Sequence, residues 1–361
     1  MGFFISISFL TGCESPSSTG TFLAGQTMGT TYHITLAESV TRQIETSLKQ
    51  EIDARLLEVN DSFSTYINSS EVSQFNNYKG TDWQEKSDEF MTVLAAAQNI
   101  SAMSDGAYDI TVGPLVNLWG FGPGFKKDNV PDDQMVKEAL SKVGYKKLMF
   151  NPDNNEIKKL QKDLYVDFSS IAKGFGVDAI AELLMAKGYK HYMVEIGGEM
   201  RVSGLNPQKV KWRIAVEKPD TETRSIHRVI NVSDVAIATS GDYRNYFEQD
   251  GVRFSHTINP KTGYPVQQEL ASVTVLAKNC MTADAWATAF MVLGYKKGYD
   301  LAIANNLAVL FLLKEGMISE KEVFKKAKKF DDKGIFGIGS DEMTREEYKE
   351  YLREKSFNIH D

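Results

Sequence analysis

The segment from Tyr192 to Gly204 constrains the fold more than any other. It reads YMVEIGGEMRVSG, in which two short strand-like runs flank the dipeptide Gly197-Gly198. A Gly-Gly pair readily adopts the positive φ angles of a tight hairpin turn. The segment therefore predicts two antiparallel strands joined by a two-residue turn.

Helix and strand patterns alternate irregularly along the rest of the chain. Helices are predicted at residues 40–66, 85–104, 132–143, 169–186 (stopped by Gly188) and 282–293 (ended by Gly294). Strands are predicted at residues 27–36 (after a turn at Gly25), 147–166 (around an Asn/Asp turn), 212–217, 228–232, 235–239, 253–257 and 271–277, and residues 106–124 read as a loop. Because neighbouring strands are often joined by tight turns, we expect an α+β fold with mainly antiparallel sheets flanked by helices.

Charge and cysteine content exclude several classes of function. The chain has 41 basic and 48 acidic residues, a net charge of −7, which gives no electrostatic support for binding nucleic acid. Its two cysteines, Cys13 and Cys280, cannot form a disulfide framework. The five histidines do not cluster like metal ligands.

The N terminus has the pattern of a bacterial lipoprotein signal. An apolar run from Phe3 ends in Leu10-Thr11-Gly12-Cys13, and a stretch rich in Ser, Thr, Gly and Pro follows to Gly20. No Lys or Arg precedes the run, and the alternative is a frayed apolar N terminus with a buried Cys13. We expect residues 1–20 to be a signal and tether with a lipidated Cys13, residues 21–340 to be one domain outside the cytoplasm, and residues 341–361 to be a charged helical tail. Charged helices are predicted at 320–329 and 344–355.

The octapeptide MTADAWAT, Met281 to Thr288, places a carboxylate and a hydroxyl four residues apart on a predicted helix. Residues at i and i+4 share one helix face, so Asp284 and Thr288 can reach the same cation. Carboxylate and hydroxyl oxygens are ligands that Mg²⁺ takes. The alternative is a capped helix, with Thr282 as its N-cap and Asp284 complementing the helix dipole.

The stretch from Val166 to Asp178 combines a strand end, two serines and two helical glycines. Ser169 or Ser170 is predicted to cap the helix. Gly174 and Gly176 each cost about 1 kcal/mol of helix stability. Two explanations remain open: an anionic phosphate bound at the helix N terminus, or a tightly packed helix crossing.

The segments 238–246 and 254–263 both run from a strand into a polar turn. His256 lies at the end of the second strand, just before Asn259-Pro260-Lys261-Thr262-Gly263. A histidine near hydroxyl groups can act as a general base, and the alternative is a structural histidine.

Together these motifs resemble the ApbE family of FAD:protein FMN transferases. The resemblance runs from about Gly25 to Leu312 and rests on eight stretches in the family's order. They are TMGT from Thr27, STY from Ser64, GAYDITVGP from Gly106, residues 167–178, IGGE from Ile196, residues 238–246, residues 255–263 and residues 282–288. Asn259 departs from the pattern, because Asp is common before that proline.

The resemblance implies that the protein cleaves FAD at its pyrophosphate, attaches FMN to a Thr or Ser of a target protein and releases AMP. The implied targets are subunits of sodium-pumping NADH:quinone reductase or a related membrane redox complex. FAD would lie in a cleft between two halves of the body, and the lipid anchor implies the periplasmic face of the inner membrane. The implied Mg²⁺ contributors are Asp284, Thr288 and Ser170, the last through its hydroxyl or its backbone carbonyl. The implied catalytic groups are Asp284 and His256, and the implied FAD contacts are Met28, Tyr66, Ala107, Tyr108, Asp109, Asp167, Lys173 and Ile258.

Two alternatives remain open, one a different enzyme and the other a binding protein. An Mg²⁺-dependent FAD pyrophosphatase would use the same site with water as the nucleophile, and a non-catalytic lipoprotein would bind FAD without turnover. Tyr66 bears on the first, because an aromatic side chain there can cover bound FAD and exclude water. A thiamine-related role has no support, because no stretch reads as a thiamine-diphosphate site.

Overall fold

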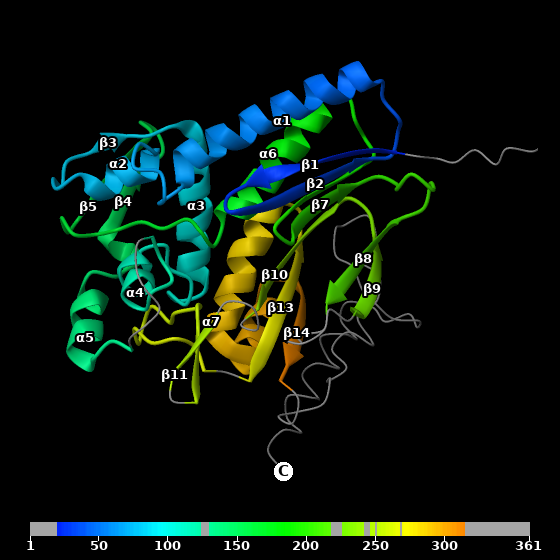
Figure 1. Cartoon of the computed structure of the whole chain (residues 1–361). Coiled ribbons are helices and arrows are strands. Elements are labelled where there is room, and N and C mark those ends of the chain that lie inside the picture. Colours follow the sequence, from blue (N-terminus) through cyan, green and yellow to red (C-terminus); the bar gives the residue numbers. More distant parts are fainter. Residues whose placement is uncertain are drawn as a thin grey trace, which may run out of the picture.

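The computed structural model describes residues 20–123, 130–217, 226–241, 246–249, 251–267 and 269–314. Its centre is a seven-stranded sheet in the order β1-β2-β6-β7-β10-β13-β14, with every neighbouring pair antiparallel (Figure 1). These strands are β1 (Thr21–Thr27), β2 (Thr30–Leu36), β6 (Tyr192–Ile196), β7 (Glu199–Ser203), β10 (Val235–Gly241), β13 (Leu270–Ala277) and β14 (Ala308–Leu313). The predicted hairpin at Tyr192 to Gly204 is confirmed as β6 and β7.

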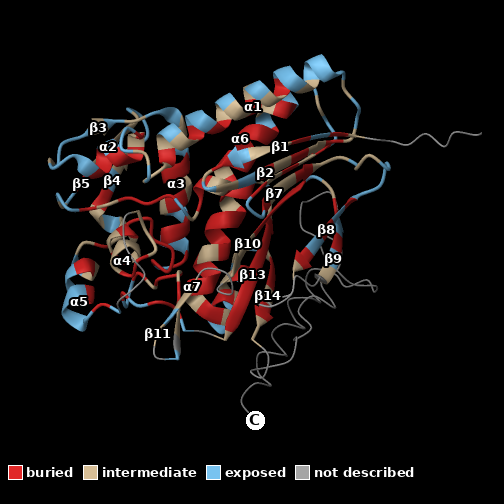
Figure 2. Cartoon of the chain, viewed as in Figure 1, coloured by how far each residue is buried: buried red, intermediate tan, exposed pale blue. Residues whose placement is uncertain are grey.

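Helices cover one face of the large sheet and a small hairpin covers the other (Figure 1). The covering helices are α1 (Arg42–Phe63), α6 (Ala172–Ala186) and α7 (Cys280–Ala304), and the opposite hairpin is β8 (Trp212–Glu217) with β9 (Ile226–Val232). In β10, Ala236 and Ala238 pack with the helices, whereas Val235 and Ile237 pack with the β8–β9 hairpin. The middle of the sheet, at β10 and β13, is therefore buried on both faces (Figure 2), whereas β1 at one edge exposes Phe22.

A second half of the body lies beside the sheet (Figure 1). It contains α2 (Glu71–Asn77), α3 (Asp88–Met103), α4 (Gly113–Leu118), α5 (Asp133–Ser141), the 3₁₀ turn η1 (Tyr145–Lys147) and a sheet of β3 (Gln84–Glu85), β5 (Glu156–Lys159) and β4 (Leu148–Asn151). A further hairpin pairs β11 (Tyr246–Gln249) with β12 (Val252–Ser255). Within the ranges given above, no helix has the length and apolarity needed to cross a membrane.

The single strand predicted at residues 27–36 is wrong. The chain forms a hairpin there, in which Met28 (φ 50°) and Gly29 (φ 71°) make the turn between β1 and β2. Gly25, the predicted turn, instead pairs with Tyr32 in the middle of β1. The Tyr32 ring occupies the space where a Cβ of residue 25 would lie, so Gly25 serves packing and not a turn.

Two predicted helix caps are also wrong. Neither Ser169 nor Ser170 caps α6, which begins at Ala172 without a side-chain cap. Helix α7 begins at Cys280, and the Asn279 side chain accepts the N–H of Thr282 at 3.0 Å, so Thr282 is not the cap. Cys13 and the predicted helices at 320–329 and 344–355 lie outside the described residues.

One lysine is buried in the second half of the body. Lys159 is fully buried, and its ammonium donates to the carbonyls of Asn76 (3.1 Å) and Tyr78 (2.9 Å) at the end of α2. Burial, together with the charge of nearby Lys79, lowers the pKa of Lys159 to about 8. The folded state therefore holds this proton less tightly than the unfolded chain does.

We expect this lysine to make the protein more stable at alkaline pH. Between pH 8 and pH 10.5 the unfolded chain binds a proton that the folded state does not, so the free energy of unfolding rises with pH. The expected gain from Lys159 is roughly 2–3 kcal/mol. Urea unfolding at pH 7 and pH 10.5, compared with Lys159→Met, checks it. An equal pH dependence in both proteins would contradict the prediction.

Candidate active site

Two carboxylates tie together the N-terminal turns of α6 and α7. Asp178 of α6 accepts the N–H groups of Cys280 (3.0 Å) and Met281 (2.9 Å). In return, Asp284 of α7 accepts the N–H of Gly174 at 3.0 Å. The first N–H groups of a helix have no partner within it, so each carboxylate satisfies donors of the other helix. The predicted metal ligand Asp284 is thereby fixed in the core.

Gly174 makes this crossing possible. A Cβ at this position would lie 2.5 Å from the Cys280 carbonyl oxygen, so any other residue would push the helices apart. Helix packing is therefore the explanation that the structure supports for Gly174. Its N–H is directed at Asp284 and is not free to bind a phosphate.

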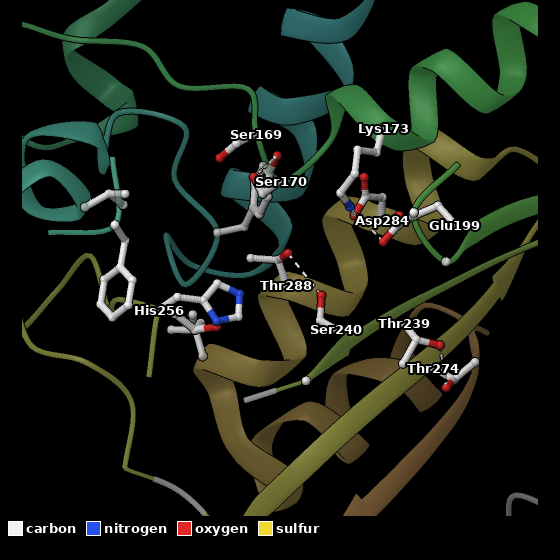
Figure 3. Close-up of a pocket in the computed structure, with 18 of the residues that line it drawn as sticks. Ser169, Ser170, Lys173, Glu199, Thr239, Ser240, His256, Thr274, Asp284 and Thr288 are labelled. Atoms are coloured by element: carbon white, nitrogen blue, oxygen red, sulfur yellow. Dashed lines mark hydrogen bonds and ion pairs between the residues drawn. The ribbon is translucent and has the colours of Figure 1, made fainter. Parts of the chain in front are cut away.

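An ion cluster of two buried carboxylates and a half-buried lysine forms next to the crossing. The Lys173 ammonium lies 2.8 Å from Glu199 Oε1 and 3.9 Å from Asp284 Oδ1 (Figure 3). Burial lowers the pKa of Lys173, but the charges of Asp284 and Glu199 outweigh this effect and hold the pKa above its usual range. Burial raises the pKa of Asp284, and it raises the pKa of Glu199 to about 7, in both cases against the opposing charge of Lys173. The ammonium is therefore charged throughout the physiological pH range.

A cavity of about 940 Å³ opens beside this cluster, between the sheet and the second half of the body. It brings together nearly all the residues implied by the family resemblance. Lining it are Tyr66, Ala107, Tyr108, Asp109, Asp167, Ser170, Lys173, His256, Ile258, Asp284 and Thr288. Met28 is not among the lining residues, because it forms the β1–β2 turn and packs on both core clusters.

Hydroxyl groups and one imidazole line the cavity near Asp284. Ser170 Oγ lies 3.1 Å from the hydroxyl of the buried Tyr108, and Thr288 Oγ1 lies 3.4 Å from Ser240 Oγ. Thr288 is one helical turn after Asp284, as predicted. His256 follows β12, and its ring makes an edge contact with Phe121. Figure 3 shows the imidazole on the same side of the cavity as Thr288 and Ser240.

Two other lining carboxylates organise the surrounding loops. Asp109 accepts from the N–H and hydroxyl of Thr111 through one oxygen and from the N–H of Tyr145 through the other. Asp167 accepts the N–H of Ser169 at 2.8 Å. Burial raises the pKa of both aspartates. Because both oxygens of Asp109 bind the protein, its contribution to a ligand is mainly to shape the loop.

The residues of the cavity fit a hard divalent cation. Asp284, Thr288 and Ser170 supply one carboxylate and two hydroxyl groups, which are oxygen donors of the type that Mg²⁺ prefers. Four lining carboxyl groups have raised pKa values, and Lys173 is the only lysine or arginine among the described lining residues. A bound cation would relieve this excess of acidic groups. No group of three His, Cys, Asp or Glu side chains suited to a metal occurs among the described residues, so substrate phosphates would have to complete the coordination.

Glu199 belongs to the motif Ile196 to Glu199, but the sequence predicted no role for it. The structure places it fully buried beside Lys173, and its second oxygen has no hydrogen-bond partner among the described residues. A signal was present in Gly197-Gly198-Glu199. Glu199 is the first residue of the strand after the hairpin turn, and its side chain points into the core. Its lysine partner is 26 residues away, so no local pattern reveals the pair.

The carboxylates, hydroxyl groups, ammonium and imidazole gathered in this cavity are those of an enzyme's active site. The chain belongs to the ApbE family, whose model matches residues 28–311. A relative from Vibrio cholerae, named FAD:protein FMN transferase, is 48% identical over 309 residues, covering 86% of this chain and 92% of that protein. A Haemophilus influenzae protein of the same name is 45% identical over 313 residues, covering 84% of this chain and 90% of that protein.

Solved structures agree with the sequence comparisons. The flavin transferase ApbE from Vibrio cholerae superposes with a TM-score of 0.76 at 45% identity, covering 83% of this chain and 94% of that one. The apo form of the Pseudomonas stutzeri flavinyl transferase ApbE superposes with a TM-score of 0.74 at 37% identity, covering 82% and 92%. The predicted family and the predicted α+β fold are confirmed, and the protein is a transferase enzyme.

Proposed function

We propose that this chain is an Mg²⁺-dependent FAD:protein FMN transferase, which moves FMN from FAD to a Thr or Ser hydroxyl of a target protein and releases AMP. One observation carries the proposal: a cavity joins the oxygen donors Asp284, Thr288 and Ser170 to the ammonium of Lys173, which lines the same cavity. Phosphoryl transfer needs positive charge around the phosphate oxygens, and this is where the cavity supplies it. The names of the relatives, FAD:protein FMN transferase, support the same reaction.

The residues of the cavity have separate tasks in this reaction. His256 takes the proton of the acceptor hydroxyl as its oxygen attacks the FMN phosphorus. A new phosphoester bond forms, the bond from that phosphorus to the bridging pyrophosphate oxygen breaks, and AMP leaves with the electron pair. Lys173, held by Glu199, stabilises the negative charge on the phosphate oxygens. Mg²⁺ bound by Asp284, Thr288 and Ser170 would neutralise charge on the phosphates.

The rings of FAD are expected to contact the apolar and aromatic lining. Ile258 is buried at the cavity wall, and Tyr66 lies at the rim with 71% of its surface exposed. An exposed tyrosine at the rim can fold over a bound ring at little cost, which would exclude water and favour transfer over hydrolysis.

The reaction can be tested by weighing the product. Residues 21–361 would be incubated with FAD, Mg²⁺ and the flavin-carrying subunit of a sodium-pumping NADH:quinone reductase, and the subunit weighed by mass spectrometry. We expect a mass gain of one FMN that is abolished by EDTA. Release of AMP and free FMN without a mass gain would support the pyrophosphatase, and bound FAD without products would support a non-catalytic carrier.

We also propose that lipid on Cys13 anchors the protein at the periplasmic face of the inner membrane. The lipoprotein pattern that ends in Leu10-Thr11-Gly12-Cys13 supports this location, and Glu14 after the cysteine favours the inner membrane. We expect Cys13→Ser to abolish palmitate labelling and to release the protein from washed membranes. Unchanged labelling and membrane association in this variant would show the assignment to be wrong.

A further inference from the structure

One edge of strand β8 lies at the cavity and has no strand partner among the described residues. Within the described part of the chain, β8 pairs only with β9, so half of its main-chain N–H and C=O groups point away from that partner. Ile214, Ala215 and Val216 make no main-chain hydrogen bond to any other described element. Such an edge is a template for another extended chain.

The cavity reaches this edge. Four successive residues of β8, Ile214 to Glu217, line it. Successive side chains of a strand point to opposite faces, so a cavity that touches all four must run along the strand's edge. Ile214 and Val216 are buried towards the large sheet, whereas Ala215 is exposed on the outer face of the hairpin.

The same cavity continues to the metal-binding residues around the end of β10. Ser240 hydrogen-bonds Thr288 on the helix-covered side of the sheet, whereas Thr239 hydrogen-bonds Thr274 of β13 on the side covered by β8 (Figure 3). Both residues line the cavity, together with Gly241 at the strand end. The edge of β8 and the reacting site therefore belong to one continuous space.

We propose that the edge of β8 binds the acceptor segment of the target protein, which lies extended along Ile214 to Val216 and presents its Thr or Ser past Ser240 to the FMN phosphorus. The inference rests on the proposed function, which requires a polypeptide to enter the cavity. The binding mode is strand addition, in which main-chain hydrogen bonds hold the segment and side-chain pockets select its sequence.

The edge of β8 suits a polypeptide better than a dinucleotide. It offers a row of main-chain donors and acceptors with the spacing of a β-ladder. The residues implied to contact FAD that line the cavity come from other elements, and none comes from β8 or from the sheet face beneath it. Ala215, Gly197 and Gly198 leave room for a chain to approach closely.

Two positions of β8 allow a matched test. Ala215 and Arg213 are both exposed on the outer face of the hairpin, but only Ala215 lines the cavity. We expect a tryptophan at 215 to fill the part of the cavity beside the edge of β8, and a tryptophan at 213 to lie outside the cavity. We expect Ala215→Trp to raise the KM for the NADH:quinone reductase subunit at least tenfold with the Kd for FAD within twofold of wild type. Arg213→Trp should match wild type in both.

A photo-crosslinking amino acid at the same two positions provides a second measurement. We expect p-benzoylphenylalanine at 215, but not at 213, to crosslink the subunit within a few residues of its flavinylated threonine. Equal crosslinking at both positions, or a KM unchanged by Ala215→Trp with transfer intact in wild type, would overturn the inference. If the wild-type protein transfers no FMN to any acceptor, the proposed function itself fails and the inference falls with it.

Discussion

Replacing Asp284 with asparagine is expected to lower the rate of FMN transfer about 1,000-fold without loss of the fold. The carboxylate is the only charged group among the three donors assigned to Mg²⁺, and it lies 3.9 Å from the Lys173 ammonium. Charge stabilisation in a water-excluded site is commonly the largest contribution to phosphoryl transfer. Asparagine has nearly the same shape, so the substitution removes the charge and little else.

The fold should survive because the amide can replace the structural role of the carboxylate. An asparagine oxygen still accepts the N–H of Gly174, which Asp284 binds at 3.0 Å. Burial raises the pKa of Asp284, so removing this charge at neutral pH should leave the melting temperature unchanged or raise it. Asp284→Ala removes the acceptor as well and should cost stability in addition to activity.

The measurement is the initial rate of subunit flavinylation over a range of Mg²⁺ concentrations, with the melting temperature as a check on folding. Asp105→Asn is a matched control, because Asp105 is exposed and pairs with Lys261, and neither residue lines the cavity. It should leave the rate unchanged. A wild-type rate and a wild-type Mg²⁺ response in Asp284→Asn would remove Asp284 from the metal site.

Short sequence patterns predicted the features that depend only on residues close together in the chain. The β6–β7 hairpin followed from Gly197-Gly198, and the shared helix face of Asp284 and Thr288 followed from their four-residue spacing. The helix was predicted to end at Gly294, and this residue does leave the helical conformation, with φ 77°, but α7 does not end there. After Gly294 the helix resumes to Ala304 because the residues beyond it pack on β14, which no local signal indicated.

The errors have a common physical cause. The predicted caps Ser169, Ser170 and Thr282 were plausible by residue type, but the N terminus of α6 is satisfied by Asp284, 110 residues away from Gly174. Contacts between distant segments depend on the whole fold, so residue spacing cannot reveal them. Strand β14 was missed for a related reason, because a short apolar run reads equally well as strand or buried helix.

Removing the Lys173 ammonium is expected to cost both stability and activity, and the two losses should be separable. Lys173→Met leaves Glu199 and Asp284 buried without their cation. Breaking a buried pair in this way typically costs roughly 3–5 kcal/mol, because the remaining charge has no compensation. Transfer should fall at least about 100-fold, since the phosphate loses a fixed positive charge.

The stability loss should depend on pH in a defined direction. Burial already raises the pKa of Glu199 to about 7 in the presence of the lysine, and without it the carboxyl should hold its proton still more tightly. Above pH 4.5, the ordinary pKa of this group, the unfolded chain ionises Glu199 but the folded variant resists ionisation. The free energy of unfolding of the variant therefore falls as the pH rises above 4.5. Lys173→Met should be close to wild type in stability near pH 4.5 and increasingly destabilised towards pH 8.

A second substitution separates the two effects. Glu199→Gln in the Lys173→Met background removes one of the uncompensated charges while keeping the size of the side chain, so most of the lost stability should return at pH 8. Activity should not return, because the cavity still lacks the ammonium. Urea unfolding and subunit flavinylation of both single variants and the double variant measure the two quantities. If the double variant regained transfer along with stability, Lys173 would be a structural residue and the charge it offers to the phosphate would be dispensable.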